Sequence, residues 1–161
     1  MELDHFRPWS IQRFAHLKDS PLNFHHACGR CNRLKSDHWP CAHASLCHDG
    51  TTGFVDPFGD DRRSYFRVEL DGTIVALQNP GSYLIKLLQL ERPLLKLLRL
   101  RRILRRKIAT HIENILPEIK AAANGHGNLS REELAREWLK LLEYYRLLDL
   151  CDVPVRELNQ N

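Results

Sequence analysis

The chain has 161 residues, of which 43% are apolar, and its formal net charge is +4. This length fits one domain, or one small domain with an extension, and allows a buried core. No run of eighteen uncharged apolar residues occurs, and Asp4, His5 and Arg7 interrupt the start of the chain. We therefore expect neither a membrane span nor a signal peptide, and we predict a cytoplasmic protein.

The first 50 residues are rich in histidine and cysteine. Seven of the nine histidines precede residue 49. Four of the five cysteines lie within twenty residues of one another, and they are Cys28, Cys31, Cys41 and Cys47. Because thiols stay reduced in the cytoplasm, this clustering favours a metal site over disulfides. The fifth cysteine, Cys151, is predicted to be a buried free thiol.

The same segment contains a histidine next to oxygen donors. Hydrolysing a phosphodiester needs a base for water and stabilisation of charge on the phosphoryl and leaving oxygens. His5 suits the base, because its ordinary pKa lies near neutral pH. Asp4 and Asn32 supply the two oxygen ligands that suffice for Mg²⁺, which keeps several waters. Asn23 is expected to hold the intervening loop by a backbone hydrogen bond and so orient the imidazole.

These segments resemble a known family. LDHFRP, then Asn23, then CGRCNRLKSD is similar to the ββα-metal motif of the HNH endonucleases, which contains D-H-x-x-P, a central asparagine and C-x-x-C-N-x-x-K. The match covers about residues 3–40. It implies that His5 is the general base, that Asp4 and Asn32 bind a catalytic Mg²⁺ or Mn²⁺, and that Asn23 positions the loop.

The resemblance also predicts how substrate is held. It implies that Lys35 contacts phosphate, and we expect the nearby Arg30 and Arg33 to bind flanking phosphates. At the position of the second histidine for which the HNH family is named, this chain has Asn32, as in a common variant. His38 is an alternative ligand for the metal. The downstream WP, DPF and Leu-rich segments look like an HNH subgroup that includes nuclease subunits of anti-phage systems such as Septu and some retrons.

A structural zinc site is expected beside the nuclease motif. Cys28 and Cys31 with Cys41 and Cys47 would form a closed tetrahedral site, with His43 or His48 as possible substitutes. Many zinc-bearing family members instead have a CxxC pair before the D-H pair. This sequence starts too late to include that pair, so we expect either that its start is trimmed or that the second ligand pair comes from downstream. A redox role for the CxxC pair is the alternative reading.

The chain after residue 60 changes character. SYFRVELDGTIVAL alternates apolar and polar residues around Asp71-Gly72 and predicts a hairpin. A long helix is predicted to start near Pro93, with one apolar face; its members are Leu97, Leu100, Leu104, Ile108, Ile112 and Ile115. Ser130 and Glu133 form a capping box for a last helix. Its predicted core stripe is Leu134, Trp138, Leu141, Tyr145 and Leu148.

One stretch is strongly basic. Residues 92–107 carry eight positive side chains and no acid. These cations form a solvated face, a contact for the DNA backbone, or a contact for an acidic protein partner.

We therefore predict an α+β protein with an HNH core and zinc site at residues 1–60, a hairpin at 61–80 and a helical region at 81–161. The predicted activity is metal-dependent hydrolysis of DNA with low sequence specificity, as the nuclease effector of a bacterial anti-phage defence complex. The C-terminal helices are expected to bind a protein partner, such as an ATPase of that complex. The alternatives are a zinc-stabilised module that binds nucleic acid or protein without catalysis, and a toxin that cuts tRNA.

Overall fold

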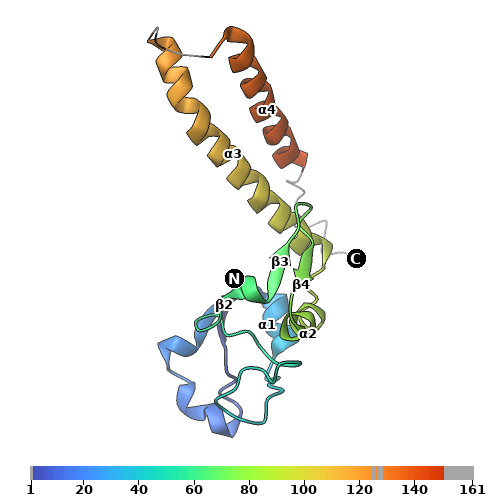
Figure 1. Ribbon diagram of the computed structural model, residues 1–161. Coiled ribbons are helices and arrows are strands. Elements are labelled where there is room, and N and C mark those ends of the chain that lie inside the picture. The colour runs from blue at the N-terminus through green and yellow to red at the C-terminus, as the bar shows by residue number, and fades with distance from the viewer. Residues whose placement is uncertain (1, 125, 127–128, 151–161) are drawn as a thin grey trace. The chain divides into compact units, whose positions relative to one another are not determined.

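The computed structural model describes residues 2–124, 126 and 129–150, so Cys151 lies outside the described residues. The predicted α+β class is confirmed by two small antiparallel sheets and several helices (Figure 1). The chain divides into unit 1, residues 1–69 and 73–92, and unit 2, residues 70–72 and 93–161. None of the described helices combines the length and apolar character needed to cross a bilayer.

The elements of unit 1 come first in the chain. They are β1 (Glu2–His5), the 3₁₀ turns η1 (Gln12–Leu17) and η2 (Pro21–Asn23), β2 (Phe24–Ala27), α1 (Gly29–Lys35), the 3₁₀ turn η3 (Arg62–Ser64), β3 (Phe66–Val68), β4 (Ile74–Ala76) and α2 (Asn79–Leu87). Unit 2 contains α3 (Pro93–Ala123) and α4 (Arg131–Leu150).

The first three regular elements form a small sheet followed by a helix. Strands β1 and β2 pair antiparallel, with Asp4 opposite His25 and His5 opposite Phe24. Helix α1 then begins after Cys28, whose Sγ accepts the Cys31 N–H at 3.2 Å and so caps an otherwise unpaired donor. Two short strands and one short helix bury little, so their stability has to come from the segments between them.

An aromatic cluster supplies that burial in unit 1. Its members come from irregular segments as well as α2, and they are Phe6, Phe14, Trp39, Cys41, Phe54, Val55 and Leu84. Trp39 contacts Phe6 and Phe14 edge to face and stacks on Phe54, with ring centroids 5.2 to 5.4 Å apart. Such pairs stabilise a core beyond the area they bury. The residues before and after α1 are therefore fixed by aromatic packing.

The hairpin prediction is confirmed. Strands β3 and β4 pair antiparallel, with Arg67 opposite Val75. At the tip Gly72 has φ +85°, and a Cβ there would lie 2.2 Å from the Lys96 carbonyl oxygen. Asp71 pairs with Lys96 at 2.6 Å, and Arg99 donates to the Gly72 carbonyl at 2.7 Å. Glycine is thus required both for the turn and for the close approach of the tip to α3.

The two long helices lie side by side as an antiparallel pair (Figure 1). The predicted starts are confirmed, because α3 begins at Pro93 and Ser130 caps α4. The Glu133 carboxylate accepts the Ser130 N–H at 2.8 Å, and the Ser130 hydroxyl accepts the Glu133 N–H at 3.2 Å. Helix α2, which the sequence analysis assigned to the helical region, belongs to unit 1.

The predicted core stripe of α4 is wrong at two positions. Trp138 is 54% exposed and Tyr145 is 51% exposed, whereas Leu141 is buried. The less exposed positions of α4 recur at spacings of three and four, and they are Glu133, Leu134, Glu137, Leu141, Tyr144 and Leu148. A helix that packs on a single neighbour buries one stripe, so the adjoining apolar stripe stays in solvent.

The aromatic cluster gives a first prediction. Phe14 is 1% exposed, so Phe14→Ala should lower the free energy of unfolding by about 3–5 kcal/mol through lost burial and the cavity left behind. Urea denaturation followed by tryptophan fluorescence measures the change. Leu22→Ala is the control, because Leu22 is 79% exposed and its loss should change stability by less than about 0.5 kcal/mol. Equal effects of the two substitutions would contradict the packing described here.

Candidate functional site

Four of the sequence-predicted site residues line one small pocket in unit 1. Asp4 and His5 come from β1, and Asn32 and Lys35 come from α1. The cavity is about 190 Å³, and its other lining residues are Leu3, Pro8, Trp9, Ser36 and Asp37. Asn32 and Lys35 are one helical turn apart, so both can face the same strand.

The His5 imidazole is held through one ring nitrogen. Its Nε2 atom lies 2.8 Å from the Lys18 carbonyl oxygen, and the ring packs against Phe24 with centroids 4.7 Å apart. A carbonyl oxygen can only accept, so Nε2 carries the hydrogen. In the neutral imidazole the lone pair is therefore on Nδ1. This arrangement fixes the tautomer that a general base requires.

Asn23 ties down the loop that carries the Lys18 carbonyl. The side chain is 3% exposed, and its Oδ1 atom accepts the Arg7 N–H at 2.8 Å. Its Nδ2 atom donates to the carbonyls of Arg7 at 3.0 Å and Leu17 at 3.2 Å. Leu17 immediately precedes Lys18, so the amide of Asn23 sets the position of the carbonyl that orients His5.

Asp4 is a buried carboxylate between two nitrogen-bearing side chains. Lys35 Nζ donates to Asp4 Oδ1 at 3.2 Å and to the His5 carbonyl at 2.6 Å. His25 Nε2 lies 3.3 Å from Asp4 Oδ2, but Oδ2 has no aligned hydrogen-bond partner among the described residues. Burial lowers the pKa of Lys35, and the Asp4 charge opposes that shift. Burial likewise lowers the pKa of His25 against the attraction of Asp4.

The residues present fit a divalent cation. The Oδ2 atom of Asp4 is a buried oxygen without an aligned donor, which is the state expected of a metal ligand. Asn32 Nδ2 donates to Glu2 Oε2 at 2.9 Å, which leaves the amide oxygen of Asn32 as its available acceptor. A carboxylate and an amide oxygen are the hard ligands that Mg²⁺ and Mn²⁺ prefer. The described residues hold no group of three or more His, Cys, Asp or Glu that could bind an ion.

The other predicted substrate contacts and the alternative ligand lie outside the pocket lining. Arg30 is exposed and donates to Gln89 Oε1 at 2.7 Å. Arg33 is also exposed, on the same helix. The His38 ring stacks on Tyr83, and its Nε2 atom contacts the Tyr83 hydroxyl. His38 is therefore engaged with α2.

The four clustered cysteines occur in different surroundings. Cys28 and Cys31 face Arg92, whose Nη2 lies 3.8 and 3.5 Å from the two sulfurs. Cys47 accepts from Arg7 Nη2 at 3.1 Å and lies 3.7 Å from Asp56 Oδ2. Cys41 belongs to the aromatic cluster. The described arrangement does not gather four sulfur ligands, so no step is assigned to zinc here.

The possible substitutes for a zinc ligand are also apart from the CxxC pair. His48 Nε2 lies 3.1 Å from the Tyr65 hydroxyl, and His43 is exposed. A structural zinc therefore stays a prediction from the cysteine pattern alone.

Comparison of the chain with family models, curated protein sequences and solved structures finds no match.

Sequence reasoning did not assign three residues that the structure brings to the site. Lys18 contributes a backbone carbonyl, which no side-chain pattern can reveal. Glu2 orients Asn32 and His25 faces Asp4. A predicted pairing of β1 with β2 could have suggested His25, because His25 lies directly opposite Asp4 in that sheet.

The thiols give a second prediction. Burial raises the pKa of Cys28, but hydrogen bonds from the Cys31 thiol and N–H and from Arg92 outweigh it, so the net shift is downward. Burial, opposed by Arg7 and reinforced by Asp56, raises the pKa of Cys47 to about 11. After treatment with EDTA, iodoacetamide should therefore label Cys28 well before Cys47 at pH 7.5, because the thiolate reacts. Peptide mass spectrometry measures both rates.

The pH dependence of the same labelling is a check on the cause. The Cys28 rate should level off at lower pH than the Cys47 rate, which should still be rising above pH 9. Equal rates and profiles would contradict the thiol environments described above. Protection of Cys28 and Cys31 before chelation, and its loss afterwards, is the result expected if the chain binds zinc.

Proposed function

We propose that this chain is a metal-dependent endonuclease that hydrolyses DNA phosphodiester bonds, as its resemblance to the HNH endonucleases implies. One observation carries the proposal. Asp4 and His5 from β1 and Asn32 from α1 line one pocket, and the Lys18 carbonyl accepts the Nε2–H of His5, which leaves the imidazole lone pair on Nδ1. A carboxylate, an amide and an oriented imidazole are the groups that hydrolysis of a phosphodiester requires.

Each residue has a role in the proposed reaction. His5 Nδ1 accepts a proton from the attacking water, while its Nε2–H remains bonded to Lys18. Asp4 Oδ2 and the Asn32 amide oxygen would hold the cation. When bound, Mg²⁺ or Mn²⁺ stabilises negative charge on the phosphoryl and leaving oxygens. Lys35 holds Asp4 in place, since its ammonium contacts Oδ1, and Oδ2 would face the ion.

The substrate is proposed to be held mainly through its backbone. Arg30 and Arg33 are exposed on α1, the helix that carries Asn32, and would contact phosphates beside the scissile one. Phosphate contacts position a duplex without reading its bases. We therefore expect cleavage with low sequence specificity. The resemblance further suggests that the chain acts as the nuclease of a bacterial defence complex.

The third prediction tests the enzyme proposal. Purified protein should nick supercoiled plasmid in Mg²⁺ or Mn²⁺, and His5→Ala should lower the rate by about 10²–10⁴-fold, because the general base is lost. The circular dichroism spectrum should be unchanged, since His5 is only half-buried. His16→Ala is the matched control, because His16 is an exposed histidine with no hydrogen bond to another described residue.

Two results would count against the proposal that the chain is a nuclease. Equal nicking by wild type and His5→Ala would indicate a contaminating nuclease. Failure of the wild type to cut, alone or with the product of an adjacent gene, would leave a binding module as the better description. Offering tRNA alongside plasmid separates a DNA nuclease from an RNA-cutting toxin.

We further propose that α4 binds a protein partner, for which an ATPase of the same defence complex is the expected candidate. The exposed apolar side chains of α4 support this, because contiguous exposed apolar surface commonly marks an interface. They are Trp138, Leu139, Leu142, Tyr145, Leu147 and Leu150. Trp138, Leu142 and Tyr145 recur at spacings of four and three, the pattern of a second helix-packing stripe.

The fourth prediction concerns this partner. Wild-type chain should co-elute with the product of an adjacent gene in size-exclusion chromatography with light scattering. Trp138→Ala with Tyr145→Ala should weaken the complex at least about tenfold, since aromatic anchors dominate interfaces. Arg136→Ala with Arg146→Ala is the control on the same helix, because both side chains are exposed. Clean separation of the wild-type proteins would refute the partner proposal.

A further inference from the structure

Four exposed cations lie within six successive residues of α3. We call Arg102, Arg105, Arg106 and Lys107 the α3 basic patch; all four are exposed. Within the part of the chain that the structure describes, none of these four side chains has a hydrogen-bond or ion-pair partner. From residue 92 to residue 112 the sequence contains no Asp or Glu. Their positive field is therefore not neutralised along this stretch of the helix.

The patch borders two adjoining hollows in the surface of unit 2. One, about 450 Å³, is lined by Leu98, Arg101, Arg102, Arg105, Arg106 and Ala109. The other, about 510 Å³, is lined by Ile103, Arg106, Lys107, Thr110, His111, Asn114 and Tyr144. Arg106 belongs to both, so the two hollows make one continuous surface. Residues 98–114 span roughly 24 Å at about 1.5 Å per residue.

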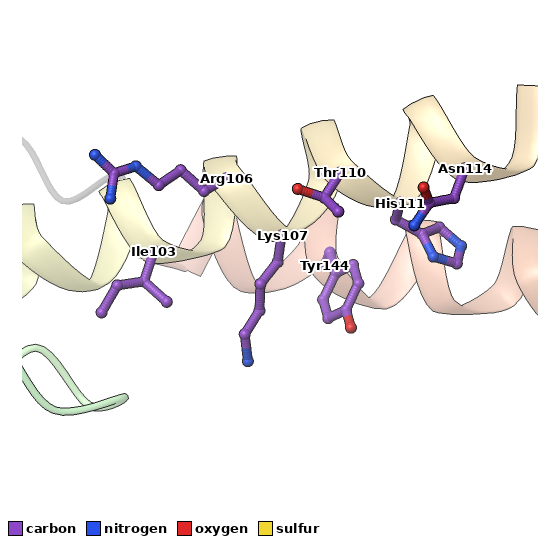
Figure 2. Close-up of a pocket in the computed structure, with 7 residues that line it drawn as sticks. All are labelled: Ile103, Arg106, Lys107, Thr110, His111, Asn114 and Tyr144. Atoms are coloured by element: carbon purple, nitrogen blue, oxygen red, sulfur yellow. The ribbon is translucent and has the colours of Figure 1, made fainter.

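The second hollow is lined by hydrogen-bond donors at the junction of α3 and α4 (Figure 2). Figure 2 shows Lys107 and the Tyr144 ring extending to the same side of α3, while Arg106 extends away from them. Thr110 and Asn114 add a hydroxyl and an amide. His111 is engaged with Glu137, whose carboxylate lies 3.1 Å from Nε2, so it is not counted among the cations.

We infer that the α3 basic patch binds the phosphate backbone of duplex DNA at a surface separate from the pocket of Asp4 and His5. The inference rests on the proposed function, because it assigns a second contact for the same substrate. The patch lies within the two hollows, which together span roughly 24 Å along α3, and this length matches about seven base pairs of duplex at 3.4 Å per phosphate on each strand. Arginine and lysine neutralise that charge without reading bases.

Two other polyanions fit the patch less well. Single-stranded DNA is gripped by successive aromatic side chains on which bases stack, whereas the first hollow has only Leu, Ala and Arg in its lining and the second adds the rings of His111 and Tyr144 at one end. An acidic protein surface combines acids with basic and apolar groups, whereas the exposed patch offers only cations. Both alternatives are outcomes of the experiment below.

The fifth prediction tests the patch by binding, without cleavage. Full-length His5→Ala chain in EDTA should bind a fluorescent 20-base-pair duplex, measured by anisotropy at several salt concentrations. Adding Arg102→Gln, Arg105→Gln and Arg106→Gln should weaken binding at 0.1 M salt by about tenfold or more. The slope of log K against log salt should become shallower by up to about 0.9 for each lost contact. Glutamine is a good helix former, so the helicity should not change.

The control removes the same charge from the other helix of unit 2. Arg131→Gln, Arg136→Gln and Arg146→Gln, all at exposed positions of α4, should leave affinity and slope within about twofold of the parent. Equal weakening by both triple variants would mean that net charge alone matters, and would overturn the inference. Unchanged binding by the α3 variant would also overturn it. So would tighter binding of the matching single strand or of polyglutamate than of the duplex.

Failure of this inference is distinguishable from failure of the nuclease proposal. Binding is measured without metal and without His5, so an inactive wild-type protein does not affect the result. Conversely, plasmid nicking that depends on His5 would stand even if the α3 variant bound DNA normally.

Discussion

The candidate site depends on the buried amide of Asn23. One side chain satisfies the Arg7 N–H and the carbonyls of Arg7 and Leu17, while the Asn23 carbonyl accepts the Phe6 N–H at 2.7 Å. These bonds fix both ends of the loop between β1 and β2. A buried backbone group left unpaired costs about 1–3 kcal/mol, so the loop cannot rearrange cheaply. The Lys18 carbonyl is therefore held in place, and it in turn selects the tautomer of His5.

The pairing of Asp4 with Lys35 positions the carboxylate in the site more than it stabilises the fold. Removing two charges from water costs about as much as their attraction returns, so a buried pair contributes little net stability. What it does contribute is a carboxylate held in a fixed position, with one oxygen already occupied by Lys35. Lys35 thus occupies Asp4 Oδ1, and Oδ2, which lies 3.3 Å from His25 Nε2, would be the oxygen that ligates the proposed cation.

Each unit is stabilised internally by a different kind of packing, and this limits what each part can do. Unit 1 packs irregular segments around Trp39 and so holds loop carbonyls in fixed positions, which a site built on backbone contacts requires. Unit 2 is a pair of helices in which each helix packs on one neighbour. It therefore leaves an apolar stripe on α4 and a basic patch on α3 in solvent. Such surfaces suit binding more than catalysis.

The sequence by itself determined the α+β class, the hairpin around Gly72, the start of α3 at Pro93 and the cap at Ser130, because turns, caps and periodicity are local properties. It also indicated Asp4, His5, Asn23 and Asn32 through their spacing. Only the tertiary structure decided that Lys35 contacts Asp4, that Lys18 orients His5, and that Trp138 lies in solvent. Those outcomes depend on which backbone atoms and which neighbouring helix come within contact distance, and a linear pattern does not encode them.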